Sequence, residues 1–353
     1  MKELFLPEER LQALMDAIEA KYETMLFTDE GIIPYRSLGE AERRQVALRG
    51  TRSPFPAKSF FLPVRESLAE YGPGVDLEEG SKRESRSKPF ALVNLRSCDL
   101  EAIGVLDHVF LEGDFVDPFY KARRDSVLVV SVDCLNATEY CFCNMVGYEP
   151  FVKNDLGLNL SPVSGGYVVR SESAKGAEVL KDFYGSDAVV RETQHQEMQQ
   201  NQAAILAQLQ DNGEKFACSR SYYEILKASI PEDKWNDLFS TCVECASCTN
   251  ICPTCYCFYM FDQKKSPEAK EAYEKLRSWD SCLLADYSRM AGVGGVKPNP
   301  RPRIRTRYEN RFRHKYEYFY ETYKQYGCTG CGRCSEACMG ATDPREVMRV
   351  LSQ

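Results

Sequence analysis

Two runs of cysteine with the same spacing constrain this chain more than any other feature. Both follow the pattern Cys-x2-Cys-x2-Cys-x3-Cys; the first run is Cys242, Cys245, Cys248 and Cys252, and the second is Cys328, Cys331, Cys334 and Cys338. Gaps of two residues let three successive thiolates converge on one iron–sulfur cube, and the fourth cysteine usually ligates the other cube. The spacing therefore predicts two [4Fe–4S] clusters with crossed ligands. Cys242, Cys245, Cys248 and Cys338 would hold one, and Cys328, Cys331, Cys334 and Cys252 the other.

Zinc and disulfides are the alternatives for cysteines at this spacing. Pairs of the C-x2-C type also bind zinc, but a zinc site closes with four ligands, usually as two pairs. Two complete runs of four fit iron–sulfur cubes better. The N-terminal sequence MKELFLPEERLQ is charged and lacks the apolar core of a secretory signal, so we expect a cytoplasmic protein. In that setting metal binding explains the 16 cysteines better than a disulfide framework does.

Length, charge and missing motifs exclude several classes of protein. A chain of 353 residues predicts about two domains, and a net charge of −7 gives no general attraction to nucleic acid. The longest apolar stretch, residues 126–132, is too short to span a bilayer, so we expect no direct membrane insertion. Neither a dinucleotide-binding nor a P-loop motif is present, and we expect no catalytic residues.

The N-terminal half reads as an α/β domain. Residues 90–95 and 127–132 have the apolar composition of buried strands, and residues 99–110 between them suit a helix. This order predicts a parallel βα unit. Residues 49–90 read as irregular. We place this domain over residues 1–205.

The C-terminal half reads as helical between the cysteine runs, notably over residues 267–278. The long insert between the runs favours an α-helical dicluster ferredoxin domain over a small ferredoxin built on hairpins. We place this domain over residues 206–353. The predicted fold class is therefore α+β multidomain.

Four further cysteines, Cys98, Cys134, Cys141 and Cys143, lie in the predicted α/β domain. Cys98 and Cys134 each follow a predicted strand, so parallel pairing would bring them to the carboxyl edge of the sheet, where α/β folds usually bind ligands. The Cys141-x-Cys143 spacing is not that of an ordinary cluster. Two interpretations stay open: a third iron–sulfur cluster, or packed and reduced thiols. We expect Cys255, Cys257 and Cys282 to pack beside the two cubes.

A basic and aromatic segment precedes the second cysteine run. Its six arginines are Arg301, Arg303, Arg305, Arg307, Arg311 and Arg313, and tyrosines and phenylalanines interleave and follow. Such a segment can bind single-stranded nucleic acid. The alternative is a helix whose rings pack on the ferredoxin core while its cations face water or an anionic partner. Cations near an all-cysteinate cluster would also raise its potential. We favour the helix and expect no nucleic-acid partner.

Several motifs together resemble those of one family. In the C-terminal half they are Cys252-Pro-Thr-Cys-Tyr-Cys-Phe258, Trp279-Asp-Ser-Cys282, His314-Lys-Tyr316 and Cys328-Thr-Gly-Cys-Gly-Arg-Cys334; in the N-terminal half they are Arg96-Ser-Cys-Asp-Leu100, Asp117-Pro-Phe-Tyr120 and Cys141-Phe-Cys143. They resemble the beta subunits of soluble sulfhydrogenases and are similar to the first subunit of anaerobic sulfite reductase. One departure is Met339-Gly340 after Cys338, where the family pattern usually has proline.

The resemblance implies an electron-transfer subunit of an anaerobic, multi-subunit oxidoreductase. It implies a partner subunit that binds FAD and NAD(P)H, and a terminal hydrogenase, sulfite-reductase or heterodisulfide-reductase-like module. This chain would relay single electrons between them through its ferredoxin-type clusters. The alternative is a reductase subunit whose α/β domain itself carries a catalytic cysteine-ligated site.

Overall fold

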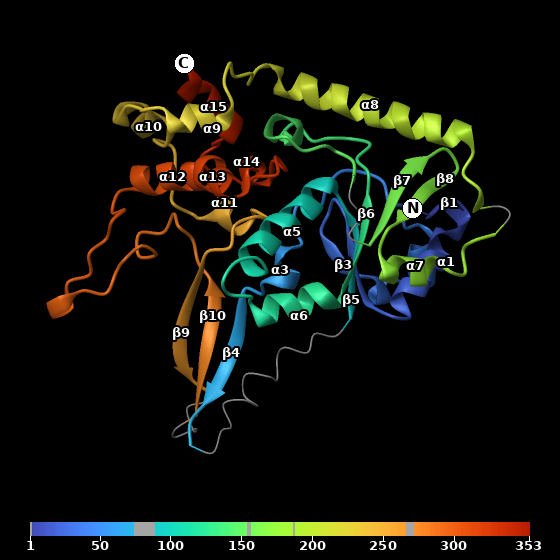
Figure 1. Ribbon diagram of the computed structural model, residues 1–353, viewed down its shortest axis with the longest axis horizontal. Coiled ribbons are helices and arrows are strands. Elements are labelled where there is room, and N and C mark those ends of the chain that lie inside the picture. Colours follow the sequence, from blue (N-terminus) through green and yellow to red (C-terminus); the bar gives the residue numbers. More distant parts are fainter. Residues whose placement is uncertain (1, 74–88, 154–156, 186–187, 266–271) are drawn as a thin grey trace.

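A seven-stranded sheet forms the centre of the N-terminal half (Figure 1). The computed structural model describes residues 2–73, 89–153, 157–185, 188–265 and 272–353. The strands run in the order β1 (Lys2–Pro7), β8 (Gly166–Ser171), β7 (Leu158–Val163), β6 (Val127–Val132), β5 (Phe90–Leu95), β2 (Glu23–Phe27) and β3 (Ile32–Pro34). Neighbouring strands are parallel from β2 through β5 and β6 to β7, and antiparallel at both edges. The prediction of two parallel buried strands is confirmed.

Helices cover both faces of this sheet, which explains why its central strands β5, β6 and β7 are almost entirely buried and mainly apolar. On one face α1 (Leu11–Glu19) and α7 (Ala174–Leu180) share a core with Ala91 and Val93 of β5. On the other face α5 (Ser97–Phe110) and α6 (Pro118–Ser126) pack against Leu92 of the same strand. Successive side chains of β5 therefore pack into two separate cores, one on each face of the sheet. The helix predicted after this strand is confirmed.

The C-terminal half is built mainly from short helices around the cysteines. They are α9 (Tyr222–Lys227), α10 (Glu232–Leu238), α11 (Ser247–Asn250), α12 (Ile304–Arg313), α13 (Phe319–Tyr323), α14 (Arg333–Glu336) and α15 (Pro344–Ser352). The turn of π-helix His314–Tyr318 joins α12 to α13. The basic and aromatic segment is helical as favoured, and the rings of Tyr308, Phe312 and Tyr316 lie in the core. Its cations do not all face water, because Arg307 and Arg311 are buried.

The long helix α8 (Glu192–Glu214) runs from the sheet to the C-terminal half (Figure 1). Its buried side chains Ile205 and Leu209 pack beside the N-terminal cysteines. The predicted domain boundary at residues 205 and 206 falls inside this helix, so that division stays a prediction. The remaining elements are the short helices η1 (Glu8–Arg10), η2 (Tyr35–Ser37), α2 (Glu40–Arg44), α3 (Lys58–Phe61), η3 (Cys143–Val146) and η5 (Val293–Gly295).

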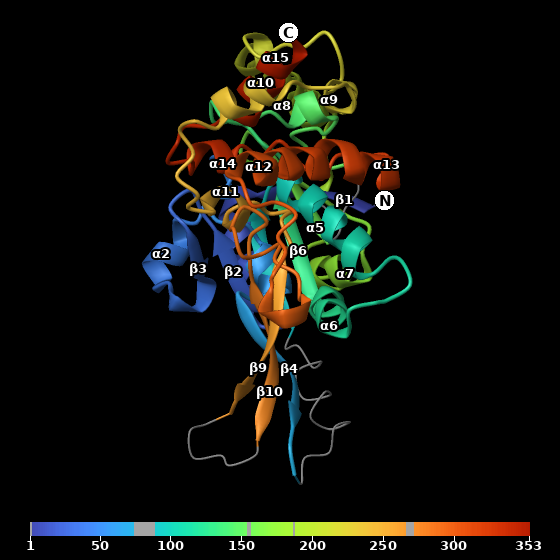
Figure 2. The same cartoon turned by 90° about the vertical axis from the view of Figure 1, so that its left-hand side faces the viewer.

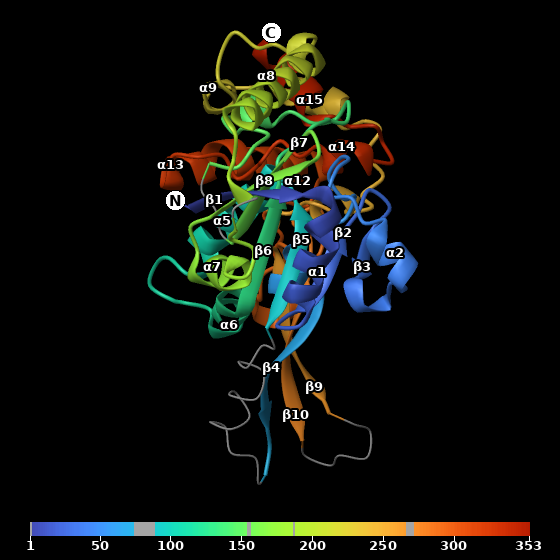
Figure 3. The same ribbon diagram turned by 90° about the vertical axis from the view of Figure 1, so that its right-hand side faces the viewer.

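A second, three-stranded sheet forms an arm that projects from the body of the molecule (Figures 2 and 3). Its strands β4 (Arg65–Tyr71), β10 (Tyr273–Trp279) and β9 (Phe258–Lys264) are antiparallel. The helix predicted over residues 267–278 is therefore wrong from Tyr273 onward, and residues 266–271 lie outside the described ranges. The irregular reading of residues 49–90 also missed α3 and β4. Pairing between strands distant in sequence overrides local helical propensity here.

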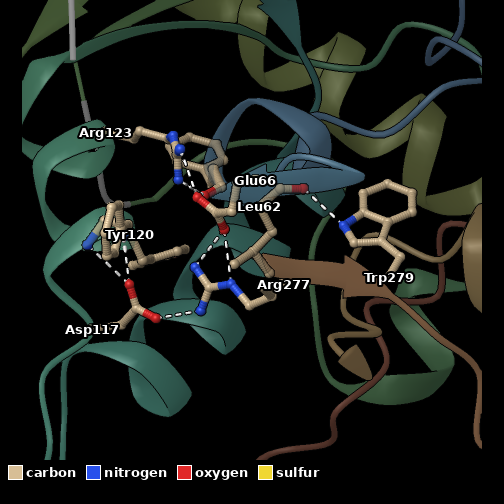
Figure 4. Close-up of polar contacts among 9 residues, drawn as sticks. Leu62, Glu66, Asp117, Tyr120, Arg123, Arg277 and Trp279 are labelled. Carbon is tan, nitrogen blue, oxygen red and sulfur yellow. Dashed lines mark hydrogen bonds and ion pairs between the residues drawn. The ribbon is translucent and has the colours of Figure 1, made fainter. Parts of the chain in front are cut away.

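Buried ion pairs hold the base of this arm against α6 (Figure 4). Glu66 of β4 accepts from Arg277 of β10 at 2.8 Å and from Arg123 of α6 at 2.7 Å. Arg277 also pairs with Asp117, the N-cap of α6, whose carboxylate accepts from the backbone nitrogen of Tyr120 at 2.8 Å. The motif that begins at Asp117 therefore joins the arm to the α/β half.

Candidate iron–sulfur centres

The two cysteine runs adopt the same local backbone. The second and fourth residues after the first cysteine have left-handed φ in both: Glu244 (56°) and Ala246 (59°), then Gly330 (64°) and Gly332 (73°). A short helix begins directly after the second of these, α11 in one run and α14 in the other. The equal spacing of the cysteines thus produces two copies of one loop, although only the second has glycine where left-handed φ favours it.

Two hydrogen bonds tie the end of each run to the beginning of the other. The Thr254 hydroxyl, just after the first run, donates to the carbonyl of Gly327 at 2.7 Å. The Thr241 hydroxyl, just before the first run, donates to the carbonyl of Gly340 at 2.7 Å. A side chain at Gly340 would collide with the Thr241 carbonyl, which explains glycine at this place in a segment that lacks the proline of the family pattern.

One cavity brings together cysteines from both runs. It is lined by Cys252 of the first run and by Cys328, Cys331 and Cys334 of the second. Arg311 Nε and the Thr329 hydroxyl belong to residues that line it and are buried without a hydrogen-bond partner. A set of four thiols with unsatisfied donors beside it fits a cluster whose sulfur atoms accept hydrogen bonds.

The remaining four cysteines of the runs, Cys242, Cys245, Cys248 and Cys338, gather nearer the surface. Burial raises the pKa of Cys248, Arg311 opposes this, and the nearby thiols of Cys338, Cys252 and Cys242 raise the pKa further. Cys245 is exposed, and its hydrogen bond with the Ser247 hydroxyl at 3.3 Å lowers the pKa of its thiol. Cys338 thus lies beside cysteines of the first run, as the crossed arrangement requires.

The four N-terminal cysteines, Cys98, Cys134, Cys141 and Cys143, line a second cavity. Cys98 and Cys134 follow β5 and β6, as the sequence predicts. Cys331 lines this cavity too, so it borders both. Burial raises the pKa of Cys134 to about 12, which in the absence of a metal keeps this thiol protonated.

The N-terminal cavity lies directly against the second cysteine run. The backbone nitrogen of Phe142 donates to the carbonyl of Gly330 at 2.8 Å. A Cβ atom on Gly330 would lie 2.5 Å from Cys143 Cα, so only glycine permits this approach. In the described part of the chain, no three His, Cys, Asp or Glu side chains are close enough to share one metal ion; the cysteines of these two sets instead line cavity walls.

Cys255, Cys257 and Cys282 form sulfur hydrogen bonds at and beyond the end of the first cysteine run, and their packing beside the clusters stays a prediction. Cys255 is hydrogen-bonded to Cys252. The Cys282 thiol forms a hydrogen bond with Cys257 that, with a second from Tyr287, lowers the pKa of Cys257 to about 6 although burial opposes it. None of the three is among the lining residues of the two cavities.

Sequence reasoning missed three buried cations that surround these centres. Arg52 donates to the carbonyl of Cys331 and pairs with Glu336 at 2.6 Å. Lys58 donates to the carbonyl of Cys255 at 3.0 Å. Arg333, inside the second run, pairs with Asp99 next to Cys98 at 2.8 Å. These contacts join residues far apart in the sequence, so no local pattern reveals them.

Within the described ranges, no helix combines the length and apolar character that crossing a membrane requires.

Comparison with known proteins agrees with this geometry. The sequence model of a family described as "4Fe-4S dicluster domain" matches residues 241–342, which include both cysteine runs. Sulfhydrogenase 2 subunit beta of Pyrococcus furiosus is 29% identical over 311 residues, which cover 86% of this chain and 85% of that protein. No solved structure gives a significant match. The resemblance drawn from the motifs is confirmed: a 4Fe–4S dicluster domain matches residues 241–342, and the chain is similar to a sulfhydrogenase beta subunit along most of its length.

Proposed function

We propose that this chain is an electron-transfer subunit that relays single electrons through two [4Fe–4S] clusters with crossed ligands. The observation that carries the proposal is the cavity in which Cys252 of the first run faces three cysteines of the second. The hydrogen bonds at Thr254 and Thr241 support the crossing at both ends. A [4Fe–4S] cluster, when bound, exchanges one electron at a time.

The residues of the chain divide into ligands and supports. Cys252, Cys328, Cys331 and Cys334 would hold one cluster, and Cys242, Cys245, Cys248 and Cys338 the other. The dicluster family match supports two clusters on this chain. The Thr254 hydroxyl lies 3.2 Å from Cys252 Sγ and links this ligand to the start of the second run. Burial of three of the four ligands around the first-named centre excludes water from it.

The N-terminal cysteines would extend the relay as a third iron–sulfur site. Cys331 lines both their cavity and the cavity of the neighbouring centre. The backbone hydrogen bond from Phe142 to the carbonyl of Gly330 joins the segments around the two cavities. Ile205 and Leu209 of α8 form an apolar part of its wall. Five cysteines in one lining, one of them shared with the neighbouring centre, favour electron relay over a substrate site.

The proposed partners are a flavin subunit and a terminal module. The similar protein is named subunit beta of a sulfhydrogenase, which supports membership of a multi-subunit assembly. Hydride transfer from NAD(P)H moves two electrons, so a one-electron relay needs a flavin beside it to separate them. We place the FAD on the partner, and a hydrogenase, sulfite-reductase or heterodisulfide-reductase-like module at the other end.

The decisive experiment is the content of iron and acid-labile sulfide per chain, with EPR of the reduced protein after anaerobic purification. About eight irons are expected for two cubes and about twelve if the N-terminal cysteines hold a third. Zinc without sulfide would contradict the proposal. C252S should lose iron from one centre and C98S only from the N-terminal site. C218S is the matched control, because Cys218 lines neither cysteine cavity.

A further inference from the structure

Two cations of the basic and aromatic segment point into the cluster region. Arg311 lies in the last turn of α12, and Lys315 follows one turn later. Each is only 4% exposed, and both line the cavity of Cys252, Cys328, Cys331 and Cys334. The backbone therefore presents these two side chains on the face that meets the cysteines.

Neither cation has a carboxylate partner among the described residues. Within the described ranges Arg311 donates to the carbonyl of Cys248, at 3.3 Å, and its Nε has no hydrogen-bond partner there. Lys315 Nζ donates to the Thr254 hydroxyl and to the carbonyl of Gly327, both at 2.8 Å. Leaving a buried charge without an opposite charge is strongly destabilising, so these positions call for a negative group.

Other arginines of the same helix are paired. Arg307 lies 2.6 Å from Glu244, and Arg313 lies 2.7 Å from Glu317. Carboxylates thus pair with Arg307 and Arg313, which do not line the cavity, whereas no described carboxylate pairs with Arg311, which does. The selective absence of carboxylates indicates that something else compensates the charge there.

The nearest candidates for negative charge are thiolates. Arg311 lies in electrostatic range of Cys248 in one centre and Cys334 in the other. Lys315 lines the same cavity as Cys252 and Cys328, and it donates to the Thr254 hydroxyl, which lies 3.2 Å from Cys252 Sγ. Lys315 therefore belongs to one centre, and Arg311 lies between the two.

We propose that Arg311 and Lys315 are the counter-charges of the cluster pair. We infer further that they raise the reduction potential of the centre lined by Cys252, Cys328, Cys331 and Cys334 above that of its partner centre. The inference rests on the proposed function. Nearby positive charge favours the more negative, reduced form of a cluster. Burial by itself disfavours that form, but it also strengthens each attraction because the local dielectric is low.

The test is an EPR-monitored redox titration of the anaerobically purified full chain and its variants. K315M should lower one midpoint, that of the higher-potential signal. At the wild-type midpoint its ratio of reduced to oxidised form should fall at least tenfold, which corresponds to about 59 mV for one electron. R311M should lower both midpoints. R313M, which removes a paired arginine of the same helix, should move neither, and K315R should restore the wild-type value.

Unchanged midpoints in K315M at full iron content would overturn the inference, as would a shift of the lower-potential signal instead. Should K315M lose iron, retention in K315R supports a need for positive charge at this position, and loss in both contradicts it. Iron content separates the counter-charge role from the proposed function. A wild-type chain without clusters contradicts the proposed function itself, whereas about eight irons with unresponsive midpoints contradict only the counter-charge role.

Discussion

The hydroxyl of Thr254 donates a 2.7 Å hydrogen bond to the carbonyl of Gly327. The first residue lies two positions after Cys252 and the second directly before Cys328, so this bond sets the last ligand of one run beside the first ligand of the other. Lys315 Nζ donates to both oxygen atoms of this hydrogen bond, the Thr254 hydroxyl and the Gly327 carbonyl, at 2.8 Å each. One side-chain bond and one buried cation thus support the crossed arrangement of the cysteines.

Removal of this hydroxyl should weaken one centre. T254V keeps the size of the side chain but leaves Lys315 with one acceptor fewer, and losing a buried partner costs about 1–3 kcal/mol. We expect faster iron loss to a chelator from the centre of Cys252 and a lower thermal midpoint. T322V is the control, because the exposed Thr322 hydroxyl bonds only to the carbonyl of Tyr318. Equal iron loss in the two variants would contradict this role.

The left-handed backbone positions of the two runs predict opposite effects on stability when alanine is replaced by glycine and when glycine is replaced by alanine. Ala246 has a left-handed φ of 59°, a conformation that costs a residue with a Cβ atom about 1 kcal/mol or more. A246G should therefore raise the free energy of unfolding by about 0.5–1 kcal/mol. G332A should lower it, because φ is 73° there and a Cβ atom would collide with the Tyr140 carbonyl. Thermal unfolding of the anaerobic holoprotein measures both, and a stabilising G332A would contradict this explanation.

The ion pairs at the base of the arm should be essential for its attachment. E66Q removes the charge that two buried arginines share, and breaking such a pair costs about 3–5 kcal/mol. We expect increased amide hydrogen exchange in β4 and β10. E70Q on the same strand is the control, because its pair with Lys265 is more exposed and worth at most about 1 kcal/mol. Exchange that is equal in both variants would show that strand pairing alone holds the arm.

His314 should make stability depend on pH below neutrality. Burial and the neighbouring Lys315 lower the pKa of this imidazole to about 4, and its ring lies 3.1 Å from the Tyr256 hydroxyl. The unfolded chain, with a pKa of about 6.5, binds the proton first as pH falls, so stability is complete above about pH 6.5 and decreases toward pH 4. The loss at pH 5 is about 2 kcal/mol.

The measurement for His314 compares unfolding midpoints at pH 7 and pH 5 in the wild type and in H314Q, which keeps a hydrogen-bonding group but does not titrate. The difference between the two pH values should shrink in the variant. An unchanged difference would assign the acid sensitivity to other groups, the thiolates included.

The sequence by itself determined those features that depend only on residues close together in the chain. The spacing of Cys242 to Cys252 and of Cys328 to Cys338 fixes two copies of one loop, because each gap spans only one turn of backbone. The strands β5 and β6 could be predicted for the same reason. A strand buried on both faces has no need for a polar residue at every second position, so it appears as a mainly apolar run. The prediction of a helix over residues 267–278 was wrong from Tyr273 onward, because β10 is stabilised by its pairing with β4 and β9.

Tertiary structure alone decided the environment of the cysteines. The sequence places Arg311 only in a basic segment and Lys315 only in the His314-Lys-Tyr316 motif. The fold buries both without a carboxylate partner among the described residues and places them beside thiols from two runs. It also brings Cys331 to the edge of the N-terminal cavity. Ligand spacing is a property of the local backbone, but charge compensation and the order of the centres depend on contacts between distant segments, which only packing of the whole chain creates.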